Sequence, residues 1–192
     1  MKRFIFGIFL ILISISLNAG QFGLKMGMTL NQIDKHARKI RDTLYEVKVP
    51  KPHSFFESYI VQISPTKGLY FVKAISKDIS TNVYGTELKS SFDNLENKLL
   101  KAYRKNTRFD FLRSGSIWNE PKDWMMALRK KERSLMSYWD KETGFKKVDN
   151  LQQIIISANP INTNKGYITL EYYYSIYDEC EKEKATKEDD SL

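Results

Sequence analysis

Glu132 is the carboxylate best placed for acid–base chemistry. If a helix begins near Pro121, Glu132 falls inside its apolar stripe. That stripe consists of Met125, Leu128, Leu135, Met136 and Trp139. A buried carboxylate must be neutral or paired, because burying a lone charge is unfavourable by several kcal/mol. Glu132 is therefore either a pocket acid with a raised pKa or a structural partner of Arg113 or of a tyrosine. We favour the structural role.

Basic residues gather beside this carboxylate. Lys122, Arg129 and Arg133 lie on one side of the same predicted helix, with Lys130 nearby. They either bind a phosphate-rich polymer or form a solvated helix face, and we favour the solvated face. Nucleic acid is not expected as a partner. Its binding needs aromatic side chains exposed among the charges, whereas the helix aromatics here lie on apolar faces.

Tyrosines mark a third candidate surface. In the last predicted strand, residues 167–177, apolar side chains alternate with a second set that is partly exposed to solvent. Tyr167, Tyr173 and Tyr177 belong to this solvent-exposed face. They suit an interface, since tyrosine offers a large contact area at low entropy cost. Covering of this face by the loop around His53 is an equal alternative.

Motifs for metal binding or nucleophilic catalysis are absent. His36 and His53 have no metal-ligand spacing, and Cys180 has no histidine nearby in the sequence. Gly115 and Gly144 stand alone, so no glycine-rich phosphate loop is formed. The sequence therefore predicts neither a catalytic centre nor a metal site nor a cofactor.

Periodicity predicts the elements that position these residues. The spacing predicts helices from Thr29 to about Leu44, after Gly85 with Thr86 as N-cap, and from about Pro121. Two hairpins are predicted, with strands at 58–64 and 69–76, then at 151–158 and 167–177. The order is α-ββ-αα-ββ. We expect an α+β fold in which a four-stranded antiparallel sheet of two hairpins carries about three helices, packed mainly on one face.

The first nineteen residues have the pattern of a secretory signal. Lys2 and Arg3 precede an unbroken apolar run, and a small residue, Ala19, ends the segment. We expect cleavage after Ala19, with membrane contact only through this segment before cleavage. One α+β domain then spans residues 20–180, and a charged, flexible tail spans 181–192. The expected location is the periplasm or the exterior.

A short stretch resembles a known group of envelope proteins. Residues 22–29, Phe-Gly-Leu-Lys-Met-Gly-Met-Thr, followed by Ile33, are similar to the G-M-T helix opening of small exported bacterial envelope proteins. These include the SmpA/OmlA-type assembly lipoproteins and proteins like the β-lactamase inhibitor protein. The resemblance covers about fifteen residues and implies an envelope or secreted interaction module. The chain lacks the lipid-bearing cysteine of the lipoproteins, and no functional residues carry over. The remainder looks like an uncharacterised bacterial secreted family.

Composition and charge exclude some classes of protein and leave two hypotheses for the function. The chain has 192 residues, 42% of them hydrophobic, a single cysteine and a net charge of +8. This excludes a disordered chain and a disulfide-stapled scaffold. The leading hypothesis is a non-catalytic module that binds an envelope protein or an anionic envelope polymer. The alternative is an envelope-polymer hydrolase that uses a carboxylate such as Glu132 or Asp110 as general acid or base.

Overall fold

Two hairpins form the centre of a nine-stranded antiparallel sheet. The computed structural model describes residues 20–189, so the predicted signal segment lies outside the described part. The hairpins are β3 (Phe56–Ser64) with β4 (Gly68–Ser76), and β8 (Leu151–Pro160) with β9 (Lys165–Tyr174). They join where β4 pairs with β9. Both hairpins agree with the sequence prediction to within a few residues.

The sheet is much larger than the predicted four strands. Its order is β1-β2-β3-β4-β9-β8-β7-β6, with β5 paired to β9. The remaining strands are β1 (Arg38–Arg41), β2 (Leu44–Glu46), β5 (Ile79–Ser80), β6 (Thr107–Leu112) and β7 (Arg133–Trp139). The helices are η1 (Gln21–Gly23), α1 (Leu30–Ile33), α2 (Thr86–Tyr103), η2 (Pro121–Asp123), α3 (Trp124–Arg129) and α4 (Tyr177–Asp189). The four-stranded sheet, the three helices and the order α-ββ-αα-ββ are therefore wrong, since the described residues form nine strands and four α-helices.

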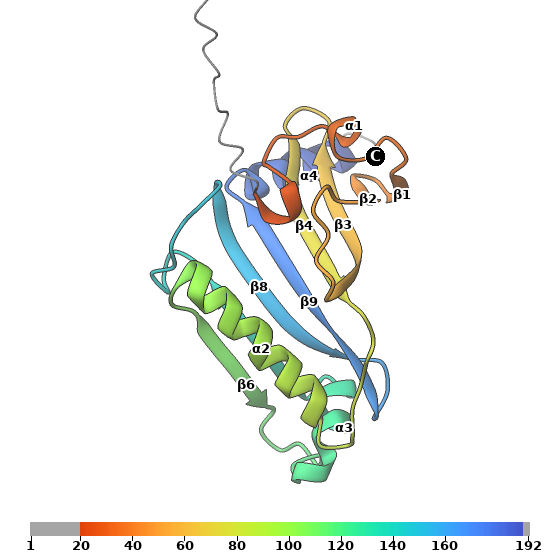
Figure 1. Ribbon diagram of the computed structural model, residues 1–192, viewed down its shortest axis with the longest axis vertical. Helices are drawn as coiled ribbons and strands as arrows, with labels where there is room; N and C mark the ends of the chain where they lie inside the picture. The colour runs from red at the N-terminus through yellow and green to blue at the C-terminus, as the bar shows by residue number, and fades with distance from the viewer. Residues whose placement is uncertain (1–19, 190–192) are drawn as a thin grey trace, which may run out of the picture.

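Helix α2 covers one face of the sheet, which we call the inner face. Its buried apolar residues recur every three or four positions and pack over β8 and β9 (Figure 1). Gly85, with φ 69°, is the N-cap instead of the expected Thr86. A Cβ at Gly85 would lie 2.2 Å from the Trp124 ring, so the helix begins where only glycine fits. Side chains of Thr81 and Asn82 accept hydrogen bonds from the first amides.

The amino-terminal segment covers the other half of the inner face. Phe22 packs edge-on against Phe56, Tyr59 and Tyr172, at ring-centroid distances between 4.8 and 5.9 Å. Leu24 is fully buried in the same core. One continuous apolar core therefore runs beneath the whole inner face.

The first predicted helix is wrong beyond one turn. Thr29 and Gln32 form the expected capping box, but α1 ends at Ile33. The Asp34 carboxylate accepts hydrogen bonds from the backbone N–H groups of His36 and Lys48, and so fixes a turn after the helix. The chain then forms the exposed strand β1. An exposed edge strand has no alternation of burial, so its sequence did not distinguish it from a helix.

The third predicted helix is wrong after Arg129. Lys131 adopts φ 59° and ends α3, after which the chain reverses into β7. In β7 the side chains of Leu135, Ser137 and Trp139 are buried at every second position. The basic and apolar residues assigned to one long helix therefore lie on two different elements.

Helix α4 packs on the opposite, outer face. It lies against β3 and β4, behind the sheet in the view of Figure 1. Residues 181–189 belong to this helix, where we expected a flexible tail. Within residues 20–189, none of the helices combines the length and apolar character that a membrane span requires.

Candidate binding site

Strands β7 and β8 pair over only part of their length. The last paired residues are Met136 and Ser157. Beyond them, β7 continues to Arg133 beside β6, while β8 continues to Pro160 beside β9. The sheet therefore splits at this end, and α3 contacts both diverging strands.

A cleft of about 530 Å³ occupies this split, and we call it the split-sheet cleft. Its charged lining residues are Arg129, Lys131 and Arg133, and no carboxylate is among the described residues that line it. The other lining residues are Leu128, Ser134, Leu135, Met136, Ser157, Ala158, Asn159, Pro160 and Tyr167. The cleft is therefore electropositive and also carries hydroxyl and amide groups. Such a lining favours an anionic ligand.

Two interactions hold the Arg133 side chain in place at this cleft, but one of its hydrogen-bond donors has no acceptor in the described part of the chain. Its Nη1 donates to Asp110 Oδ1 at 2.6 Å, and its guanidinium lies 5.9 Å from the centre of the Trp124 ring. Its Nε is buried and finds no acceptor among the residues that the structure describes. A buried donor without a partner is unfavourable, so an acceptor that entered here would gain a hydrogen bond.

The structure brings together three of the residues proposed from the sequence. Tyr167 of β9, Arg129 of α3 and Arg133 of β7 all line the split-sheet cleft. Lys122 does not line it. Lys122 lies in η2, where its ammonium is 2.9 Å from Glu120. The basic stripe was thus expected on one helix, whereas the fold gathers part of it from separate elements.

Tyr173 and Tyr177 lie elsewhere. Their rings are 4.8 Å apart and pack with Phe71, Tyr70 and Cys180 between the outer face and α4. Burial raises the pKa of both tyrosines. Tyr177 was expected in the last strand, but β9 ends at Tyr174 and Tyr177 is the first residue of α4. Tyr173 is therefore covered by α4, through Tyr177, instead of by the loop around His53. They form a small second core.

Glu132 is not a buried acid. It is half-buried in the turn between α3 and β7, where its backbone N–H and C=O bond Ala127 and Arg113. The buried carboxylate of this region is Glu96, which accepts hydrogen bonds from Asn106, Arg108 and Ser137. The sequence carried a signal for it, since Glu96 is four residues after Phe92 and three before Leu99 on the apolar face of α2.

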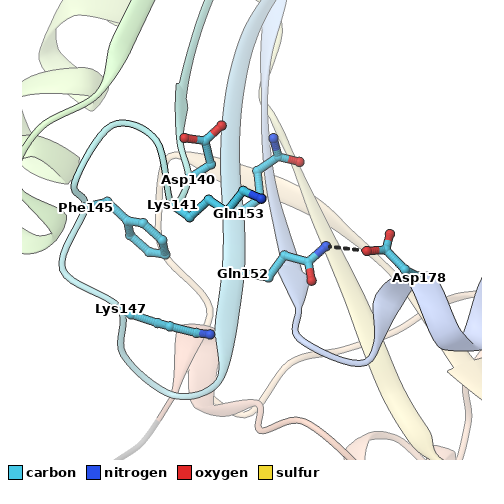
Figure 2. Close-up of a pocket in the computed structure, with 7 residues that line it drawn as sticks. All are labelled: Asp140, Lys141, Phe145, Lys147, Gln152, Gln153 and Asp178. Atoms are coloured by element: carbon cyan, nitrogen blue, oxygen red, sulfur yellow. Dashed lines mark hydrogen bonds between the residues drawn. The ribbon is translucent and has the colours of Figure 1, made fainter.

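A second cleft, of about 440 Å³, lies between the β7–β8 loop, β8 and the start of α4. Figure 2 shows its two carboxylates on separate elements, with Asp178 turned toward Gln152. Asp140 accepts hydrogen bonds from the backbone amides of Glu142 and Thr143. Both carboxylates are thus engaged in structural hydrogen bonds. Asp110, the other acid named for hydrolysis, pairs with Arg133.

The part of the chain between residues 20 and 189 contains no group of three histidine, cysteine or acidic side chains arranged to hold a metal. His53 has a local structural role, because its Nδ1 accepts a hydrogen bond from the Phe55 amide. No protein-family model, curated protein or solved structure matches the chain.

Proposed function

We propose that the chain is an exported, non-catalytic interaction module that binds an anionic group in the split-sheet cleft. The partner is an envelope protein or an anionic envelope polymer. The observation that carries the proposal is the convergence of Arg129, Lys131 and Arg133 on a cleft without a lining carboxylate. Export rests on the signal pattern of residues 1–19.

The chemistry of the lining suits a carboxylate or a phosphate. Lysine and arginine side chains only donate hydrogen bonds, and a charged acceptor strengthens each of them. The side chains of Ser134, Asn159 and Tyr167 add neutral polar groups around the cations. The partly buried position of Arg133, whose side chain is 18% exposed, reduces solvent screening of the interaction.

Titration with two defined polyanions, polyglutamate and polyphosphate, tests the anion site. The full-length chain is compared with Arg129→Gln/Lys131→Gln. The matched control, Lys122→Gln/Lys130→Gln, removes the same charge outside the cleft. We expect the cleft variant to lose about tenfold in affinity for at least one polyanion, since charge-assisted hydrogen bonds are lost. The control should retain most of its affinity. Equal losses in both variants, or no binding by the parent chain, would overturn the proposal.

Cell fractionation tests the proposed location independently. We expect the protein in the periplasm or the medium, with an amino terminus at Gly20 when it is sequenced by mass spectrometry. An intact chain that keeps Met1 to Ala19 and stays in the cell interior would contradict export.

A further inference from the structure

Strand β6 forms one border of the sheet. It ends the strand order, and among the described residues it pairs only with β7 (Figure 1). Its four central residues, from Arg108 to Phe111, are exposed. Phe109 and Phe111 lie on the outer face, because they alternate with Arg108, and their exposed fractions are 45% and 56%. An exposed strand edge is a template for pairing with a further strand.

Every second residue of β6 directs its backbone groups away from the sheet. Arg113 N donates to Glu132 O, so Arg113 continues the register of β6 with β7 as a hydrogen-bonded pair. In an antiparallel ladder such pairs recur at every second residue. The odd-numbered residues of β6 therefore bond to β7. The even-numbered residues Arg108, Asp110 and Leu112 direct their N–H and C=O groups to the free edge.

The side chains at this edge are complementary to those of a copy of the same strand. In an antiparallel pair of two β6 strands, residues directed outward must oppose residues directed outward. The register with Phe109 opposite its own copy places Arg108 opposite Asp110 on both sides of a twofold axis. The registers on either side of it oppose Arg108 to Arg108 or Asp110 to Asp110. Like charges directly opposite are destabilising, so charge selects a single register.

Both charges remain accessible in the single chain. Arg108 pairs with Asp93 and Glu96 of α2, and its side chain is still 36% exposed. Asp110 pairs with Arg133, and its side chain is 41% exposed. Pairing of two β6 strands would join the ion pairs of Arg108 in one copy to the ion pair of Asp110 in the other. Charges of alternating sign would then cross the junction.

We propose that β6 binds a second copy of this chain, so that two copies form a twofold-symmetric dimer with one continuous antiparallel sheet. Such an interface is closed, because the same surface of both copies is used. The other border of the sheet does not suit this arrangement. Three of the four residues of β1 are cationic, namely Arg38, Lys39 and Arg41, and a copy of β1 would oppose them with like charges.

Cysteine cross-linking of the full-length chain tests the register. In the proposed dimer residue 109 opposes its own copy in a non-hydrogen-bonded pair, in which the Cα atoms are about 4.5 Å apart. Phe109→Cys should therefore form an intermolecular disulfide under mild oxidation. Phe111→Cys is the matched control, since it is exposed on the same face but lies about 14 Å from its own copy. We expect Phe109→Cys to cross-link about tenfold faster, because only its sulfur atoms are within bonding reach.

Sedimentation velocity over a dilution series tests the dimer itself. We expect the parent chain to dimerise. Phe109→Glu and Phe109→Lys should each weaken dimerisation by about tenfold, because like charges would meet at the twofold axis. An equimolar mixture of the two variants should restore the dimer. Ile40→Glu, at an exposed position in β1, is the control and should dimerise like the parent.

The proposal is overturned if the parent chain stays monomeric at every concentration. It is also overturned if the two cysteine variants cross-link at equal rates, since the copies would then meet through another surface or register. Failure of the mixed Glu and Lys variants to associate, while each is folded by circular dichroism, would exclude Phe109 from the twofold axis. If either charged variant unfolds, the cysteine pair still decides the question.

Discussion

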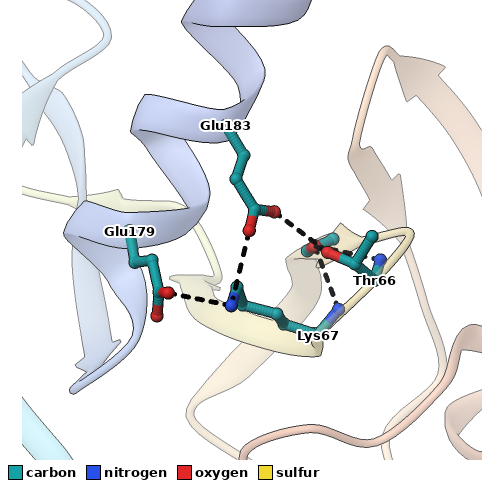
Figure 3. A network of polar contacts seen from close by, with 5 residues as sticks. Thr66, Lys67, Glu179 and Glu183 are labelled. Atoms are coloured by element: carbon teal, nitrogen blue, oxygen red, sulfur yellow. Dashed lines mark hydrogen bonds and ion pairs between the residues drawn. The ribbon is translucent and has the colours of Figure 1, made fainter.

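The Lys67 ammonium lies 2.9 Å from Glu179 Oε1 and 3.4 Å from Glu183 Oε1, and so ties the β3–β4 turn to α4 (Figure 3). Thr66 adds a hydrogen bond from its hydroxyl to Glu183. These polar contacts add to the docking of α4 that the apolar cluster around Cys180 provides.

Removal of Lys67 should loosen α4. Burial raises the pKa of the Cys180 thiol, so in the docked state it reacts slowly with a thiol reagent near neutral pH. We expect Lys67→Ala to speed this reaction about threefold to tenfold, since partly exposed ion pairs contribute roughly 0.2–1 kcal/mol each. Added salt should act in the same direction on the parent chain. Lys77→Ala is the control, and equal rates for the two variants would mean that the aromatic cluster alone holds α4.

Glu96 should be the carboxylate whose loss destabilises the fold most. It links α2 to β7 through Ser137 and to β6 through Arg108. We expect Glu96→Gln to lower the free energy of unfolding by about 2 kcal/mol, because a buried charged acceptor is lost. Urea denaturation measures the change. Glu57→Gln, at an exposed position in β3, should have little effect. Similar stability of the two variants would show that the network adds little to the fold.

The contribution of Asp34 should depend on pH. Hydrogen bonds from the backbone N–H groups of Lys48 and His36 lower the pKa of its carboxyl below 3.8. A carboxyl group whose pKa is lowered by folding stabilises the fold at pH values above 3.8. This stabilisation is lost as the pH falls through the pKa that the group has in the folded state. We therefore expect Asp34→Asn to be less stable than the parent at pH 7, with the difference shrinking toward pH 2. Urea midpoints across this range provide the measurement, and Glu142→Gln is the control for removing an exposed carboxylate.

Gly85 should tolerate no side chain. Its φ of 69° strains other residues, and an added Cβ would meet the Trp124 ring at 2.2 Å. We expect Gly85→Ala to lower the free energy of unfolding by about 2–4 kcal/mol. Gly115 is a matched control, because it has φ 77° but no atom within 4 Å of an added Cβ. Gly115→Ala should lose about 1 kcal/mol, from backbone strain alone. Equal losses would exclude the ring contact as a cause.

The elements that could be predicted from the sequence are those with a regular hydrophobic periodicity. Helix α2 and the two hairpins have long runs with a single period, so tertiary contacts did not override them. Strand β6 was missed because its inward side chains, such as Arg108 and Asp110, are polar. They pair with Glu96 and Arg133, which lie on other elements, 12 and 23 residues away in sequence. Such pairing leaves no local signal.

The candidate site could be predicted only in part, for a related reason. Arg129 and Arg133 were selected by residue type, and four-residue spacing placed them on one helix. The reversal at Lys131 instead puts them on α3 and β7, and only the divergence of β7 from β8 brings them beside Tyr167. A break in strand pairing is a property of the whole sheet, which hydrophobic periodicity does not encode.

The pairing of β4 with β9 has a consequence for how the chain acquires its structure. These neighbours are about ninety residues apart in sequence, and β9 is the last strand to be synthesised. The central ladder cannot close until β9 has been synthesised, so folding of this ladder should be slow. Until then the hairpin of β3 and β4 exposes an apolar edge, which makes the nascent chain a candidate for chaperone protection.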